Sequence, residues 1–330
     1  MNKFNKLVFS TLSLLALTVM TSCEGGGLTI EDAVANQRVM EAMEQMTTTE
    51  IESFEIDVTA DFDYLQRVFD EQLTVLERRH LDAAGEVHVK VNDLFGDDAV
   101  GSVIASASIL AEENGEVLVD VDVDASIYLS EGWVYADLTG VTEIITAMGE
   151  TPPEITTIKK YVGNLATAIG YDPTQPIELP FDMTTMLPYM NTIDDIVATE
   201  SDGELTVVYT ITMNDVVDVF MKVMEDSDEF NPEELTSDQI EEYRNMVLTQ
   251  LSSVVELTTA KFTIGVGADG FLSKLYADLN LAVTVPGEVG HEVHEVEGSL
   301  HIDIDNMNQI VDVVLPDNLD TYTEMPEEVA

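Results

Sequence analysis

The sequence predicts an α+β fold in which an antiparallel sheet carries helices on one face. Three observations support this class. Long segments alternate apolar and acidic residues with a period of two, which is typical of a sheet with one solvated face. Dipeptides that favour tight hairpins, Asn114-Gly115, Asp202-Gly203 and Asp269-Gly270, lie between strand-like segments. Segments with helical periodicity gather in the middle of the chain, between two blocks of strands, which is the order expected of α+β proteins.

The first 23 residues predict export followed by lipid attachment. Two lysines precede an apolar run, and two small residues precede the single cysteine of the chain. These features are, in order, Lys3, Lys6, Leu7–Met20, Thr21, Ser22 and Cys23. The pattern is that of a secretory signal, and its end resembles the lipobox of bacterial lipoproteins, although Leu is more usual than Met at the first lipobox position. We expect residues 1–22 to be a lipoprotein signal peptide, Cys23 to carry the lipid, and residues 23–28 to be a flexible tether. The alternative is a plain secretory signal or an uncleaved helix.

The charge of the chain is extreme. There are 64 acidic and 13 basic residues, which gives a formal net charge of −51, and loss of the two signal lysines would make it −53. Such a surface repels nucleic acid and anionic lipid headgroups, so we predict no nucleic-acid partner. The hydrophobic content of 45% is that of a globular protein, and we expect residues 29–330 to form one domain. The acidity suits either a solvated exterior in a saline habitat or the capture of cations or basic partners.

The first block of predicted elements follows a helix that ends near Met46. Apolar–acidic alternation from Phe54 to Tyr64 predicts the first strand. The apolar spacing of Leu65–Leu81 fits a helix better than a strand, and we interpret this segment as a helix. The next predicted strands are Glu86–Leu94, Ser102–Leu110, Glu116–Leu129 and Trp133–Leu138.

The middle of the chain predicts helices, and the last third predicts strands again. The helices are expected over Val141–Met148, over Ile155–Ile169, around Thr184–Met190, after Asn214 and after Thr236. A strand from Leu205 to Met213 interrupts them. The later strands are expected over Leu257–Val266, Phe271–Val285, Val289–Glu297, Ser299–Ile304 and Val311–Leu315. Hairpin-length links within each block favour antiparallel pairing.

One group of acidic residues resembles a calcium-binding loop. Asp120, Asp122, Asp124 and Glu131 occupy positions 1, 3, 5 and 12 of an EF-hand pattern, but Ala125 stands where the sharp turn needs Gly. The intervening valines predict a strand, on which these carboxylates would share one face instead of wrapping an ion. We therefore expect no calcium loop here, and a weak cation site between acidic strands remains an alternative.

Other motifs that carry chemistry are missing from the sequence. His291 and His294 would face opposite sides of a strand and could not share a metal ion. The sequence contains no phosphate-binding glycine loop, no nucleophile elbow and no Cys/His arrangement. We therefore predict a protein that is not an enzyme, with no catalytic residue, no metal site and no cofactor.

The order of elements resembles the LolA-like and LppX-like lipoprotein superfamily, which includes uncharacterised lipoproteins of low-GC bacteria. Three segments carry the resemblance besides the lipobox: SEGWVYADLTG (Ser130–Gly140), ADGFLSKLYADLNL (Ala268–Leu281) and VLPDNLDTY (Val314–Tyr322). The resemblance implies a strongly curved antiparallel sheet, or half-barrel, that is closed on one side by helices around an apolar cavity for acyl chains. The large charge and the segment Leu65–Leu81 depart from the pattern.

These observations predict an extracytoplasmic lipoprotein that is held at the cell membrane by lipid on Cys23 and binds a lipid or another amphiphile. Methionines are abundant around the predicted helices, and such flexible side chains either fill a core or line a pocket. The cavity candidates are Trp133, Tyr135, Met186, Met190, Phe220 and Met224. The alternative is an acidic cell-surface domain with a solid core that binds cations or a protein partner.

Overall fold

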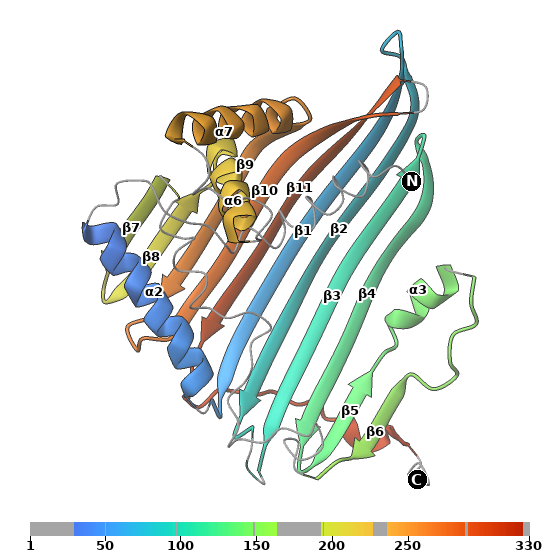
Figure 1. Cartoon of the computed structure of the whole chain (residues 1–330). Helices are drawn as coiled ribbons and strands as arrows, with labels where there is room; N and C mark the ends of the chain where they lie inside the picture. The colour runs from blue at the N-terminus through green and yellow to red at the C-terminus, as the bar shows by residue number, and fades with distance from the viewer. Residues whose placement is uncertain are drawn as a thin grey trace. The chain divides into compact units, whose positions relative to one another are not determined.

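The computed structural model describes residues 30–49, 51–94, 96, 98–147, 149–163, 193, 195–226, 236–287 and 290–325. Within this part of the chain, four α-helices accompany an open 12-stranded sheet (Figure 1). The strand order is β12-β6-β5-β4-β3-β2-β1-β11-β10-β9-β8-β7. The predicted α+β class is therefore correct at a coarse level. The chain divides into two compact units, and β10 (Leu272–Pro286) contributes residues to both.

The first unit contains residues 46–177, 273–276 and 286–330, and we call it the long-strand unit. Its elements are β1 (Phe54–Asp70), β2 (Val75–Asn92), β3 (Val100–Glu113), β4 (Glu116–Ser130), β5 (Trp133–Asp137), α3 (Val141–Ala147), β6 (Thr157–Tyr161), β11 (Gly290–Asp305), a 3-10 turn (Leu319–Thr321) and β12 (Thr323–Glu324). The strands β11, β1, β2, β3 and β4 pair antiparallel in that order, whereas β12 pairs parallel with β6. Figure 1 shows β1 to β4 running side by side over most of their length.

Strand alternation gives these five strands two chemically different faces. We call one the apolar face, because its central rows contain almost only apolar residues and glycine. It includes Ile56, Val58, Ala60, Phe62, Gly85, Val87, Val89, Val103, Ala105, Ala107, Val121, Val123, Ile127, Leu300 and Ile302. The other is the acidic face, which includes Asp57, Asp61, Asp63, Asp82, Glu86, Glu112, Asp120, Asp122, Asp124, Glu297 and Asp303. The period-two pattern of the sequence predicted this division.

The second unit contains residues 1–45, 178–272 and 277–285, and we call it the helix-bearing unit. Its elements are α2 (Ile30–Thr48), β7 (Asp195–Ser201), β8 (Glu204–Thr210), α6 (Met213–Asp226), α7 (Ser237–Ser252) and β9 (Val255–Val266). The side chains of Tyr209 and Val39 are fully buried here. The Tyr209 hydroxyl donates a hydrogen bond of 2.7 Å to Oδ1 of Asn36, which satisfies a polar group inside an apolar core. The predicted start of α7 is confirmed, since Thr236 and Gln239 form a capping box.

Two of the predicted helices are wrong. Leu65–Leu81 is not a helix: β1 continues to Asp70 and β2 begins at Val75. The carboxylate of Asp70 accepts hydrogen bonds of 2.8 Å from the backbone N–H groups of Gln72 and Thr74, and these bonds stabilise the reversal between the strands. The predicted helix Ile155–Ile169 contains strand β6, and its residues from 164 onward lie outside the described part.

The predictions for strands fail in three smaller ways. β7 was not predicted, and the two strands expected between 289 and 304 form the single strand β11. Val311–Leu315 is not a strand. There the backbone N–H and C=O of Val311 bond to the side-chain amide of Asn92, so a side chain takes the place of a ladder partner.

Candidate functional site

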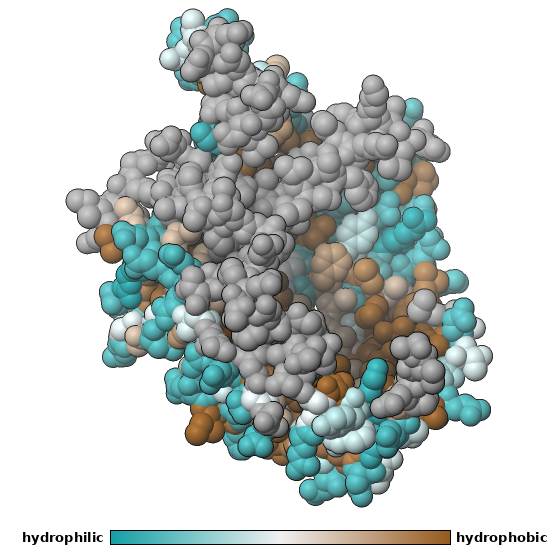
Figure 2. Space-filling model, turned by 60° about the horizontal axis from the view of Figure 1, so that its bottom comes forward, coloured by the Kyte–Doolittle hydropathy of each residue, from teal (hydrophilic) through white to brown (hydrophobic). Residues whose placement is uncertain are grey.

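The apolar face of the long-strand unit is the feature most suggestive of a binding function. Large apolar side chains remain partly accessible on it, with Phe62 41%, Ile127 42% and Leu300 42% exposed. Figure 2 shows apolar side chains gathered in a hollowed part of the surface on the right of the view. Contiguous exposed apolar surface of this kind usually marks a site that binds a ligand, a protein partner or a membrane.

Small residues run across the centre of the apolar face. Ala60 on β1 pairs with Gly85 on β2, and Gly85 pairs with Ala107 on β3. A Cβ atom at Gly85 would lie 3.3 Å from the carbonyl oxygen of Ser106 and 3.7 Å from Cβ of Ala107. Larger side chains flank this row, such as Phe62 and Val58 on β1. The face therefore has low relief at its centre and can accept an extended apolar chain laid against the backbone.

Near the β1–β2 hairpin, polar side chains replace the apolar residues of this face. The hydroxyl of Tyr64 and Nδ1 of His294 are joined by a hydrogen bond of 2.7 Å, and the Gln66 amide donates to Glu292 at 3.2 Å. Burial raises the pKa of Tyr64, and the nearby Glu292 raises it further. Burial lowers the pKa of His294, although Glu292 acts in the opposite direction. The same face thus changes along its length from apolar to polar, with hydrogen-bonding side chains at the transition.

Trp133 and Tyr135, two of the predicted cavity residues, lie on the acidic side of the sheet. Tyr135 pairs with Tyr128, whose side chain shares a face of β4 with Asp120, Asp122 and Asp124. Each predicted residue has an aromatic partner at an edge-to-face angle. Trp133 contacts Tyr161 with ring centroids 5.2 Å apart, and Tyr135 contacts the buried Tyr322 at 5.8 Å. Nζ of Lys159 also lies 5.8 Å from the Trp133 ring.

Phe220, another cavity candidate, belongs to the helix-bearing unit. It packs against a cluster formed by Val217, Met221 and Val247, which lies between α6 and α7. The cluster also takes in Ile240, Tyr243, Leu248 and Leu251. Among the described residues, the structure therefore brings Trp133 and Tyr135 together in one unit and places Phe220 in the other.

The remaining candidates fall outside the described part of the chain. Met186, Met190 and the side chain of Met224 lie outside the described residues, as do Cys23, the signal segment 1–22 and the tether 23–28. None of the helices in the described ranges is long and apolar enough to cross a membrane.

The two metal-like patterns of the sequence do not form ligand sets in the described structure. Asp120, Asp122 and Asp124 are exposed along β4, as the strand interpretation predicts. The rings of His291 and His294 contact different partners, since His291 stacks on Phe69 at 4.8 Å and His294 bonds to Tyr64.

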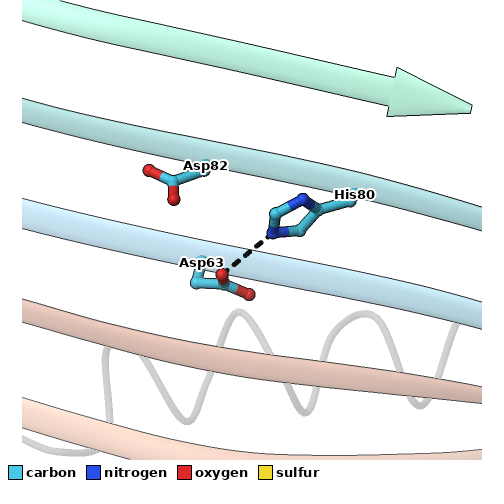
Figure 3. A group of neighbouring side chains, drawn as sticks. All are labelled: Asp63, His80 and Asp82. Atoms are coloured by element: carbon cyan, nitrogen blue, oxygen red, sulfur yellow. Dashed lines mark hydrogen bonds and ion pairs between the residues drawn. The ribbon is translucent and has the colours of Figure 1, made fainter. Parts of the chain in front are cut away.

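A different group of side chains could hold a metal ion. Potential ligand atoms of Asp63, His80 and Asp82 all lie within 4.8 Å of one another on the acidic face. Figure 3 shows that Asp63 projects from β1 and the other two residues from β2. The sequence pattern does not predict this group, because the apolar spacing of Leu65–Leu81 favours a helix around His80. A signal that could have revealed it is the alternation of polar and apolar residues over His80, Leu81, Asp82 and Ala83, which has the period of a strand.

Comparisons with known proteins add little. No family model matches the chain, and no curated protein matches it. Among solved structures, one similar chain is a beta-barrel-like protein of the domain of unknown function DUF1849 from Brucella abortus. It is 9% identical, the match covers 78% of this chain and 100% of that chain, and the TM-score is 0.13. A likeness at this level carries no argument about fold or function.

Proposed function

We propose that the protein is an extracytoplasmic lipoprotein, anchored to the cell membrane by lipid on Cys23, that binds a lipid or another amphiphile on the apolar face of its long-strand unit. The observation that carries the proposal is the partly exposed apolar face spanning five strands. The half-barrel shape and the relation to LolA-like and LppX-like lipoproteins form part of the same proposal.

The chemistry of this face suits an amphiphile as its ligand better than it suits a protein partner. Acyl chains need a long apolar path without hydrogen-bonding groups, and the apolar face provides one along its strands, over the low centre at Gly85. A headgroup needs polar partners at one end of that path, and Tyr64, Gln66 and His294 supply them. Complete burial of a methylene contributes about 0.8 kcal/mol, so each part of an acyl chain that this face removes from water favours binding.

Two exposed isoleucines on opposite faces provide a matched test. Ile127 lies on the apolar face and is 42% exposed, whereas Ile104 lies on the acidic face and is 44% exposed. We expect Ile127→Glu to weaken binding of a fluorescent fatty acid by about tenfold or more, because a carboxylate beside an acyl chain loses hydration without gaining a partner. Ile104→Glu should leave binding unchanged.

The measurement uses the full chain with Cys23→Ser, purified without detergent, and native mass spectrometry tests whether it retains a co-purified ligand. Equal affinities of the two variants, or no binding by the parent chain, would refute the proposal.

The alternative is an acidic cell-surface domain with a solid core that binds a protein partner or cations. The packing of Phe220 within the α6–α7 cluster favours it for that part of the chain. Failure of every amphiphile to bind would support it.

A further inference from the structure

We propose that Asp63, His80 and Asp82 form a binding site for a divalent transition-metal ion such as Zn²⁺. This site is independent of the amphiphile site, because it lies on the acidic face of the same strands.

The strand register builds the site. Asp63 on β1 lies directly opposite Asp82 on β2. His80 precedes Asp82 by two residues, so its side chain projects from the same face of β2. Figure 3 shows the Asp63 and Asp82 carboxylates on the same side of the His80 imidazole, with the Asp63 carboxylate nearer to the ring. The mutual spacing of the ligand atoms, within 4.8 Å, needs only small side-chain adjustments to surround one ion at about 2.0–2.2 Å.

A neighbouring carboxylate orients the imidazole as in known metal sites. Nδ1 of His80 lies 3.4 Å from Glu112, which is its direct partner on β3, and Nε2 points to Asp63 at 2.9 Å. A ligating histidine commonly donates its second ring N–H to a carboxylate, which fixes the tautomer and raises the basicity of the metal-binding nitrogen. The side chain of His80 is only 18% exposed, so its orientation is restrained.

The charges of the site call for a cation. Two aspartates directly opposite each other on neighbouring strands repel, which destabilises the pair. An ion with charge +2 between them would remove this repulsion.

The ligand set of one imidazole and two carboxylates suits Zn²⁺, Ni²⁺ or Co²⁺, whereas Ca²⁺ and Mg²⁺ prefer oxygen ligands alone. With half of the Asp63 side chain exposed, water can complete the coordination and the ion can exchange.

The test compares two histidines of the same strand and face. His88 contacts Asp57 at 2.5 Å and Glu86 at 3.8 Å, but among the described residues it belongs to no group with metal-binding geometry. Zn²⁺ binding to the full-length protein without a histidine tag is measured by competition with a chromophoric chelator, in 150 mM NaCl with excess Mg²⁺ to occupy the diffuse acidic surface. We expect one saturable site, a loss of affinity of at least about tenfold in His80→Gln and in Asp82→Asn, and no change in His88→Gln.

A second readout separates coordination from general charge. Co²⁺ bound to the parent protein should show visible absorption bands that His80→Gln lacks, while circular dichroism shows both proteins folded. Glu112→Gln should weaken binding by roughly 10–100-fold, as loss of an orienting carboxylate usually does. Binding that does not saturate, that Mg²⁺ abolishes, or that is the same in His80→Gln and His88→Gln would overturn the proposal.

Discussion

At the scale of single residues, the histidines show how burial and neighbouring charges shift a pKa. Five histidines occur in the sequence, and the pKa values of two of them are shifted in opposite directions. Carboxylates of Asp63 and Glu112 raise the pKa of His80 against a partly opposing effect of burial. Burial lowers the pKa of His294. The surroundings of these two histidines therefore shift their pKa values in opposite directions, although both lie in one sheet.

The lowered pKa of His294 predicts acid sensitivity. Folded His294 binds a proton more weakly than the unfolded chain, in which histidine titrates near 6.5. The unfolded state therefore takes up more protons as the pH falls, so the contribution of His294 to stability is present above about pH 6.5 and is lost as the pH falls through the folded pKa. NMR titration should give His294 a pKa below 6.5.

The matching stability experiment uses His294→Gln. Urea unfolding between pH 7.5 and pH 5 should show a smaller loss of stability in this variant than in the parent protein. A His294 pKa above 6.5, or an unchanged pH dependence in the variant, would contradict the assigned environment.

At the scale of elements, hairpin turns set how the long strands pair. Asn114 and Gly115 both have positive φ, at 53° and 82°, as a type I′ turn requires, and this turn was predicted. Glu131 and Gly132, at 51° and 75°, connect β4 to β5 in the same conformation. They were not predicted, because Glu is rare at such a position.

The two glycines predict different costs of substitution. A Cβ at Gly115 would meet nothing within 4 Å, so Gly115→Ala should cost only the backbone penalty of about 1 kcal/mol. A Cβ at Gly132 would lie 3.0 Å from Tyr161 and 3.1 Å from the carbonyl oxygen of Gly163, so Gly132→Ala should cost clearly more. Urea denaturation of the two variants measures the difference, and equal costs would argue against the close approach of β5 and β6 at this turn.

Sequence patterns located most strands because each has one solvated and one apolar face, as in β4 and β9. They failed at the tip of the β1–β2 hairpin, where ion pairs within and between strands take the place of alternation. There Arg67 pairs with Glu295, and Arg79 with Glu77 and Glu113. The same failure hid the group of Asp63 and His80, since two residues assigned to different kinds of element cannot be recognised as neighbours. The sequence predicts which residues of each strand are on the apolar face, but it does not predict the order of the strands in the sheet.

At the scale of the whole molecule, the net charge and the predicted anchor act against each other. A formal charge of −51 repels anionic headgroups, so residence at a membrane needs a covalent attachment. We expect Cys23→Ser to release the protein from membranes completely, as measured by fractionation of cells into soluble and membrane pools. A high-salt wash serves as the control, because it should leave the parent protein bound. Substantial membrane retention of the variant would show that another part of the chain inserts or docks.

The described sheet is open, so it has two edges, and these edges bear on aggregation. One edge is β12, which is only two residues long. The other is β7, where Asp195 and Glu200 border the exposed Val197. Short length and edge charges are the devices by which natural sheets avoid pairing with one another. The acidity of this chain therefore also disfavours edge-to-edge joining of its copies, a protection that weakens as salt screens the charges.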